Sequence, residues 1–325
     1  MAAMIEAAVR YALDKIAVPA GRTLWLYGEP SFAVGDVYHP QRDEADLLQR
    51  KGHVVYSDHE KLGRDYNAVF LNCPKQHDEA EGLLALALDR SRGFVMCVAR
   101  NDAGGNRLRR MMEAYGVPVE SLAKSHCQIV RTEASSKADR TLLSQNLLHL
   151  APRPKVMDGE EWWTVPGIFN WNQIDPGSRL LMQHLPADFT GSVADFGCGY
   201  GYISAMLARH HPAIQQIDAY DLDARAIFCC ARNGEEKIKP AWQDIKKLRA
   251  GPLYDAVVMN PPFHAGKDEN VDLGRTFIIK ALETLRPRGR LFLVANRHLP
   301  YEKVVPGLTH LYQGEGYKIL MTRVP

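Results

Sequence analysis

Two short loops, each preceded by an apolar run, most constrain what this chain can fold into. The first covers residues 195–201 in the form D-x-G-x-G-x-G, and the second, residues 260–263, reads Asn-Pro-Pro-Phe. The first loop contains Asp195, Gly197, Gly199 and Gly201. Glycines let the backbone turn sharply and approach a bulky ligand. Its third glycine comes one residue too early for the dinucleotide fingerprint G-x-G-x-x-G, which favours a bulky cofactor without a pyrophosphate.

The second loop carries groups that can activate a planar amino nitrogen. Such a nitrogen delocalises its lone pair into the adjoining π-system, so it is a poor nucleophile until hydrogen-bond acceptors draw it towards tetrahedral geometry. The side-chain oxygen of Asn260 and a backbone carbonyl of the Pro261-Pro262 step can each accept one N–H. Phe263 offers a face for a flat base, a contact of ~1–3 kcal/mol per base at comparable sites. These residues predict direct methyl transfer to a planar nitrogen, without a metal or a general base.

The residues between the two loops follow the strand and helix alternation of a Rossmann-like fold. We expect a strand that ends at Ala194, a helix over residues 203–208 and a second strand over residues 217–221. A further apolar strand over residues 254–259 delivers Asn260 to its carboxyl end. Because ligands bind at the carboxyl edge of a parallel sheet, both loops are predicted to face one site.

Three acidic residues beyond the glycine loop are candidates for cofactor contacts. Asp221 closes the second predicted strand, 20 residues after Gly201, where an acidic side chain reaches the ribose hydroxyls of a bound nucleoside. Asp223 fits better as the N-terminal cap of the next helix. Asp244 has two interpretations that the sequence leaves open, an acceptor for an adenine amino group or an ordinary exposed loop residue.

The second half of the chain resembles class I S-adenosylmethionine-dependent methyltransferases. It is most similar to the bacterial ribosomal RNA guanine-N2 methyltransferases. This family includes methyltransferase C, which acts on the small ribosomal subunit, and methyltransferase G, which acts on the large ribosomal subunit. Besides the two loops, the resemblance rests on Pro166-Gly167-Ile168-Phe169, residues 175–181, His264 and residues 294–301. It covers residues 160–325. It implies S-adenosylmethionine as cofactor and the exocyclic N2 of a guanine in ribosomal RNA as methyl acceptor, with 16S RNA of the small subunit as the expected substrate.

The resemblance also assigns roles within the predicted site. Gly177 and Ser178 are expected near the methionine end of the cofactor, and Asp195 either orders the glycine loop or meets the amino-acid part of the cofactor. Asn-Pro-Pro-Phe loops also serve adenine-N6 and protein glutamine methylation, and the residues alone do not distinguish these amines from guanine N2. A third alternative is an RNA-binding ribosome assembly factor in which methylation is secondary.

The first half of the chain repeats the pattern of the second in a degenerate form. Residues 66–75 echo residues 254–263, while the predicted strand over residues 23–27 leads into a loop without alternating glycines. With the resemblance, this predicts an α/β chain of two tandem Rossmann-like domains: a degenerate one over residues 1–150, and a catalytic one over residues 160–325. The first supports the fold or grips RNA through Arg107, Arg109, Arg110 and Lys124, unless these lie on a solvated helix face.

The segment between the two predicted domains reads as a boundary followed by a cover for the site. The boundary is expected between about residues 145 and 165, where prolines interrupt the preceding pattern. Residues 161–165 are predicted to form a strand, paired with a short strand near Ile168. Phe169 and Trp171 are expected to line the base pocket, and a helix is expected to start within residues 175–181.

Composition sets weaker limits. A chain of 325 residues fits two domains of about 150 residues. No apolar run approaches the ~20 residues that cross a bilayer and no signal peptide is visible, so we expect a cytoplasmic protein without membrane contact. The six cysteines lack metal-ligand spacing and read as buried thiols. A net charge of +2 does not identify a nucleic-acid binder, and the expected partner is ribosomal RNA or the assembled small subunit, bound by a monomer.

Overall fold

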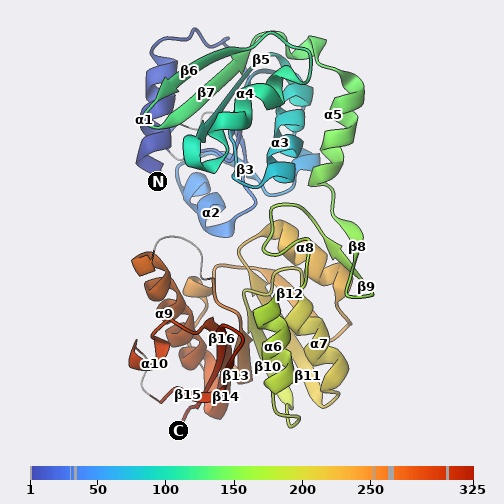
Figure 1. Cartoon of the computed structure of the whole chain (residues 1–325), viewed down its shortest axis with the longest axis vertical. Helices are drawn as coiled ribbons and strands as arrows, with labels where there is room; N and C mark the ends of the chain where they lie inside the picture. The colour runs from blue at the N-terminus through green and yellow to red at the C-terminus, as the bar shows by residue number, and fades with distance from the viewer. Residues whose placement is uncertain (1, 30, 33–34, 252, 263–266, 305–306) are drawn as a thin grey trace. The chain divides into compact units, whose positions relative to one another are not determined.

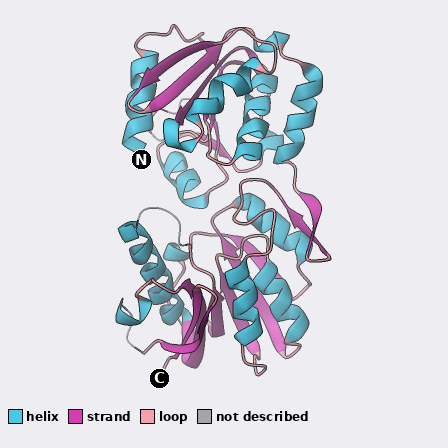
Figure 2. Cartoon of the chain, in the orientation of Figure 1, coloured by secondary structure: helices cyan, strands magenta, loops and turns pink. Residues whose placement is uncertain are grey.

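The chain folds as two compact units, each built from one large sheet and the helices that cover it. The computed structural model describes residues 2–29, 31–32, 35–251, 253–262, 267–304 and 307–325. Unit 1 comprises Met1–Ala151 with Val165–Gly167, and unit 2 comprises Pro152–Thr164 with Ile168–Pro325. Figure 1 labels most of the helices and strands of both units, and Figure 2 distinguishes their helices from their strands.

Unit 1 contains a seven-stranded sheet in the order β3-β2-β1-β4-β5-β7-β6. The first five strands in this order run parallel, whereas β7 is antiparallel to both β5 and β6. The strands are β1 (Thr23–Leu26), β2 (Asp36–Tyr38), β3 (Val54–Tyr56), β4 (Tyr66–Asn72), β5 (Ser91–Arg100), β6 (Glu120–Lys124) and β7 (Cys127–Thr132). Parallel pairing requires crossover connections, which the intervening helices provide.

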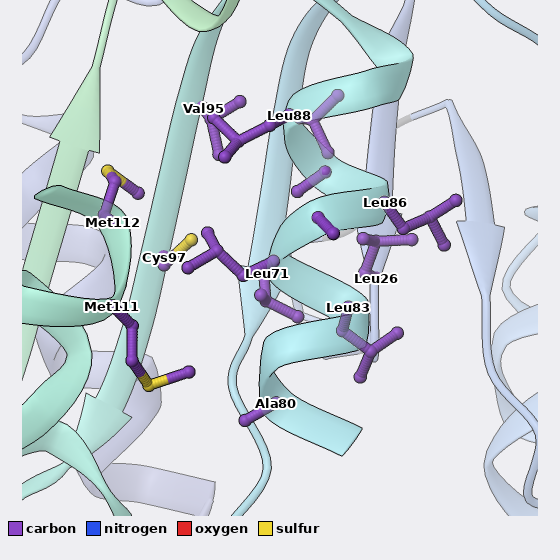
Figure 3. Close-up of a cluster of buried hydrophobic side chains, with 14 of the residues drawn as sticks. Leu26, Leu71, Ala80, Leu83, Leu86, Leu88, Val95, Cys97, Met111 and Met112 are labelled. Carbon is purple, nitrogen blue, oxygen red and sulfur yellow. The ribbon is translucent and has the colours of Figure 1, made fainter. Parts of the chain in front are cut away.

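Helices bury both faces of the sheet in unit 1. They are α1 (Ala2–Leu13), α2 (Arg42–Arg50), α3 (His77–Arg90), α4 (Gly105–Glu113) and α5 (Arg140–Leu147). Figure 3 shows the face under α3, where Leu26, Leu71 and Val95 from the strands meet Leu83 and Leu88 from the helix. Since successive strand side chains point to opposite faces, their sequence neighbours form a second core beneath α1 and α2.

Unit 2 repeats this topology. Its seven-stranded sheet has the order β12-β11-β10-β13-β14-β16-β15, with β16 antiparallel to β14 and β15 and the other pairs parallel. The strands are β10 (Gly191–Phe196), β11 (Ile214–Asp221), β12 (Ile238–Trp242), β13 (Tyr254–Met259), β14 (Leu285–Asn296), β15 (Thr309–Gly314) and β16 (Tyr317–Arg323). The matching strand order confirms the predicted tandem Rossmann-like architecture.

The helices of unit 2 connect and cover these strands. They are α6 (Pro176–His184), α7 (Tyr202–His210), α8 (Ala224–Asn233), α9 (Lys267–Thr284) and α10 (Tyr301–Val304). In the core, Phe196 of β10 and Val257 and Met259 of β13 pack with Phe277 and Ile278 of α9. This apolar packing holds the ends of β10 and β13 in place, and the two predicted functional loops begin at those ends.

A separate hairpin corrects one prediction from the sequence. The strand expected over residues 161–165 is present as β9 (Glu160–Thr164), but its partner is β8 (Arg153–Met157), which precedes it. The predicted partner near Ile168 is wrong, because Ile168 lies in a bend. Asp158 and Gly159 join the two strands with positive φ angles of 52° and 82°, a turn that closes the hairpin locally.

Other expectations concern cysteines, metals and membranes. Five of the six cysteines are buried and Cys73 is half-buried, and all six are free thiols. In the part of the chain that the structure describes, histidine, cysteine and carboxylate side chains do not gather into a group that could hold a metal ion. Among the same residues, no helix is both long and apolar enough to cross a membrane.

Candidate functional site

The glycine loop joins the end of β10 to the start of α7. Gly199 has a φ of +55°, and a Cβ added there would meet no atom within 4 Å. Gly201 has a φ of +93°, and a Cβ there would lie 2.7 Å from the sulfur of Cys230. Both residues adopt left-handed backbone conformations that favour glycine. Gly201 therefore permits close packing against α8, whereas Gly199 leaves open space beside the loop.

A pocket adjoins this loop at the carboxyl edge of the sheet. Phe196 of β10 pairs with Met259 of β13, so the loops that follow these two strands begin side by side. The pocket is lined by Phe169, Asn170, Asp175, Ser178, Gly197, Cys198, Gly199, Tyr200, Tyr202, Ile203 and Asn260. The pocket therefore brings the glycine loop together with the asparagine of the second loop.

Asn260 is held by two acceptors from the start of α6. Its Nδ2 donates one hydrogen bond to Oδ2 of Asp175 at 2.7 Å and one to Oγ of Ser178 at 2.9 Å. Among the described residues, none donates a hydrogen bond to Oδ1 of Asn260. The side-chain oxygen is therefore the hydrogen-bonding atom of this carboxamide that is available to a ligand.

The rest of the second loop is described in part. Pro261 is buried and Pro262 is exposed. Phe263 and His264 lie outside the described residues, so the expected base stacking on Phe263 stays a prediction. Phe169, expected beside the base, lines the pocket and is 49% exposed. Trp171 is not among the lining residues, and its ring lies 4.5 Å from the Nζ atom of Lys155.

Asp175 is a site residue whose role the sequence did not reveal. It caps α6, because its Oδ2 accepts a hydrogen bond from the backbone N–H of Ser178 at 2.7 Å. Its Oδ1 accepts one from Nδ2 of Asn170, also at 2.7 Å. An aspartate followed by a proline in the first helical turn is a recognisable start signal, and the helix was expected here. The signal does not predict the additional bond to Asn260.

Asp195 lies in the core of unit 2 and does not line the pocket. Its side chain is fully buried at the end of β10, and it accepts a hydrogen bond from Oγ of Ser204 in α7 at 2.6 Å. Burial raises the pKa of Asp195 to about 7. Of its two expected roles, ordering the loop fits this position, because the bond ties β10 to the helix that follows the glycines.

Asp221 stands at the end of β11 and contacts the glycine loop. Its carboxylate accepts hydrogen bonds from the backbone N–H groups of Gly199 at 2.8 Å and Asp223 at 2.9 Å. Burial raises the pKa of Asp221 to about 6. Asp223 caps α8 by accepting from the backbone N–H of Arg225, which confirms its predicted role as a helix cap.

Asp244 is not an exposed loop residue, so that interpretation is wrong. It is only 3% exposed, and it caps the 3-10 helix over residues 245–247 by accepting from the backbone N–H of Lys246 at 3.0 Å. Asp244 does not line the described pocket. Nearby, the indole nitrogen of Trp242 donates to the carbonyl of Leu222 at 2.6 Å, which fixes the end of β12 against the loop after β11.

Comparisons with known proteins agree with this geometry. The family model described as "Methyltransferase small domain" matches residues 160–321. A ribosomal RNA small subunit methyltransferase C from Ectopseudomonas mendocina (strain ymp) is 32% identical over 294 residues, with 86% of each chain covered. This chain belongs to the ribosomal RNA small subunit methyltransferase C family. A relative of the same description from Pseudomonas aeruginosa (strain UCBPP-PA14) is 33% identical, with 79% of each chain covered.

A solved structure of similar fold extends over both units. It is the T. thermophilus 16S rRNA N2 G1207 methyltransferase in complex with AdoMet and guanosine. The TM-score is 0.80 at 22% sequence identity, with 98% of this chain and 92% of that chain covered. The similarity supports the fold of the whole chain, including the degenerate first half, which the family model does not reach.

Proposed function

We propose that this chain transfers a methyl group from S-adenosylmethionine to the exocyclic N2 of a guanine in 16S ribosomal RNA. One observation carries the proposal. Asn260 stands beside the glycine loop with both N–H groups engaged by Asp175 and Ser178, so its Oδ1 is available to an amino group of the substrate. The names of the relatives, which are ribosomal RNA small subunit methyltransferases, support RNA over protein glutamine as the substrate.

Three features of the glycine loop and its surroundings support the proposed cofactor. The backbone at Gly199 faces open space that a side chain would occupy, as expected where a ligand approaches the main chain closely. Gly197 also lines this space, and Asp221 braces the loop from the end of β11, the position at which an acidic side chain reaches a ribose. Asp195 would act through the loop, and Asp244 would hold the adenine end. When bound, S-adenosylmethionine supplies an electrophilic methyl group.

The residues of unit 2 would prepare the amino group for this transfer. Oδ1 of Asn260 accepts one N–H of guanine N2, and the backbone carbonyl of Pro261 accepts the other. These bonds draw the nitrogen towards tetrahedral geometry, aim its lone pair and stabilise the positive charge that develops on it. Pro262 has no N–H to compete for these acceptors, and Phe263 stacks the base. The ammonium-like product is strongly acidic and loses its extra proton without a dedicated base.

We propose further that unit 1 has lost catalysis and serves the fold more than RNA binding. Two of its expected RNA-contacting residues already have partners within the unit: Arg107 donates to the carbonyl of Lys75 at 2.6 Å, and Arg109 pairs with Glu113 at 2.6 Å. These bonds give the two arginines a role within unit 1 itself. Action on assembled subunits, a monomeric state and a cytoplasmic location stay predictions.

The identity of the methylated nucleoside tests the proposed function. Purified protein is incubated with tritiated S-adenosylmethionine and either 16S RNA, 30S subunits, 23S RNA or a protein release factor, and the labelled products are hydrolysed and separated. We expect label in N2-methylguanosine from a small-subunit substrate. Label in N6-methyladenosine or in glutamine would contradict the guanine assignment, and label from 23S RNA alone would contradict the small-subunit assignment.

A further inference from the structure

The carboxylate of Asp175 is at the centre of a small hydrogen-bond network beside the pocket. It accepts from the backbone N–H of Ser178, from Nδ2 of Asn170 and from Nδ2 of Asn260, each at 2.7 Å. Asp175 lies 85 positions before Asn260 in the chain and belongs to a different element, so this contact is formed only in the folded unit. The contact matters because of a particular ambiguity in the asparagine side chain.

A carboxamide has two ends of nearly equal size and opposite hydrogen-bonding character. Rotation of the Asn260 amide by 180° would place Nδ2 where Oδ1 now stands, and a donor there cannot accept an N–H from a substrate amine. An ionised carboxylate only accepts hydrogen bonds, so the end that faces Asp175 must be the NH2 group. Oγ of Ser178 takes the second hydrogen of this group at 2.9 Å.

We propose that Asp175 is a positioning residue that selects the rotamer of the Asn260 carboxamide in which Oδ1 faces the target amine. The inference rests on the proposed function and adds the residue that makes Asn260 an acceptor. Asp175 does not need to touch the substrate. Its effect passes through Asn260, and it is separate from its second task, which is to cap α6.

Two substitutions separate positioning from the other roles of this carboxylate. Asp175→Ser keeps a good helix cap, but a shorter hydroxyl both donates and accepts, so it no longer specifies the amide orientation. Asp175→Asn keeps an oxygen that can accept from both Ser178 and Asn260, because the capping bond directs its amide oxygen to the position of Oδ2. The second variant removes the negative charge and keeps these two bonds, while its new NH2 group faces Asn170, whose amide must rotate to present its oxygen.

The experiment measures kcat and KM for methyl transfer to 30S subunits and the dissociation constant of S-adenosylmethionine. We expect Asp175→Ser to lower kcat about 10-fold or more, with cofactor affinity retained, and Asp175→Asn to stay within about 3-fold of the wild type. If Asp175→Asn lost as much as Asp175→Ser, the charge itself would be required and the positioning role would be overturned.

A double-mutant cycle with Asn260→Ala decides whether Asp175 acts through Asn260. In the Asn260→Ala background, Asp175→Ser should have no further effect on kcat, since there is no carboxamide left to orient. An equal loss in both backgrounds would overturn the inference. The matched control is Asp139→Ser: Asp139 caps α5 of unit 1 through the N–H groups of Thr141 and Leu142, so the same exchange keeps a helix cap away from the pocket and should leave kcat unchanged.

The outcomes also separate this inference from the proposed function. Wild-type kcat in Asp175→Ser, together with a large loss in Asn260→Ala, would overturn the positioning role alone. Full activity in Asn260→Ala would overturn the use of Asn260 as an acceptor, and the positioning role with it. Methylation of a different amine by the wild type would overturn the guanine assignment. The role of Asp175 would still hold if Asp175→Ser lost kcat and Asp175→Asn kept it.

Discussion

The two units use the same sheet in the same order, but the loops that follow the first strand differ, and in unit 2 this loop lines a pocket. In unit 1, Leu26 at the end of β1 pairs with Leu71 of β4. In unit 2, Phe196 at the end of β10 pairs with Met259 of β13. The residue after Leu71 and the residue after Met259 are both asparagines. The register therefore provides matched positions at which the units can be compared residue by residue.

The two matched asparagines make different hydrogen bonds. Nδ2 of Asn72 donates to the backbone carbonyl of Tyr27 at 2.7 Å, which ties the end of β4 to the loop after β1. Nδ2 of Asn260 donates to Asp175 and Ser178, which lie outside the sheet. Asn72 thus bonds to the other loop of its own unit, whereas Asn260, which lines the pocket, bonds to residues at the start of α6.

The residue after the first strand shows the same difference. Tyr27 and Gly197 occupy matched positions, and both have positive φ angles, 57° and 81°. The tyrosine places a large side chain there, and its hydroxyl donates to the buried Glu79 at 2.5 Å. The two positions therefore share a left-handed backbone conformation but differ in side chain.

Residues that serve only the fold are shared by both units. Tyr66 donates to Asp36 at 2.6 Å, and at the matched positions Tyr254 donates to Asp218 at 2.8 Å. The first pair links β4 to β2 across β1, and the second links β13 to β11 across β10. The comparison indicates that interactions within the sheet were kept in both units, whereas the loops at the carboxyl edge diverged.

The largest expected effect comes from placing the tyrosine of unit 1 in unit 2. Gly197→Tyr should lower S-adenosylmethionine affinity about 100-fold or more, because the ring fills the space next to Gly199. Isothermal titration calorimetry measures the affinity. Gly197→Ala is the matched control: its Cβ would lie 3.9 Å from the nearest atoms, so it adds only the strain of a positive φ, about 1–2 kcal/mol. Wild-type affinity in Gly197→Tyr would contradict the explanation that a tyrosine at this position keeps the cofactor from binding.

A smaller effect concerns how the stability of each unit depends on pH. Unit 2 has a titratable side chain, Asp195, at the position where unit 1 has Trp25, which does not titrate. The pKa of Asp195 is about 7 in the folded protein and about 3.9 in an unfolded chain. Between these values the folded state holds a proton that the unfolded state has lost. This contribution to stability is therefore present at low pH and is lost as the pH rises through 7. The raised pKa of Asp221 acts in the same direction.

Hydrogen exchange at the amides of β10 and β1 measures this difference. From pH 5 to pH 8, the opening free energy of β10 should decrease, after correction for intrinsic exchange, and that of β1 should not follow it. Asp195→Asn should remove most of the decrease in β10, because the side chain is then neutral at every pH. An unchanged decrease in this variant would show that another group causes it.

The outcome for the fold shows what local patterns can predict. The strand over residues 254–259 was predicted at the bounds of β13, and the helix expected over residues 203–208 lies within α7. Both segments have apolar periodicity that is readable in a short window. The pairing of β9 was missed although a local signal exists, because Asp158-Gly159 is a dipeptide that favours a two-residue hairpin turn and so pairs β9 with the strand before it.

The candidate site shows a similar limit. Gly197, Gly199 and Asn260 line the pocket as expected from their motifs. The bond between Asp175 and Asn260 spans 85 residues, and nothing in the local sequence of either residue encodes it. The burial of Asp195 was also not readable, since an acidic residue before a glycine loop is chemically suited both to a ligand contact and to a bond with Ser204.

The central claim is that chemistry occurs at the asparagine of unit 2 and not at its counterpart in unit 1. The most direct test compares Asn260→Ala with Asn72→Ala in single-turnover methyl transfer to 30S subunits, below the melting temperature of both variants. We predict that Asn260→Ala lowers the transfer rate about 10²–10³-fold, and that Asn72→Ala leaves it unchanged while lowering stability. Equal rates for the two variants, or a larger loss in Asn72→Ala, would contradict the claim.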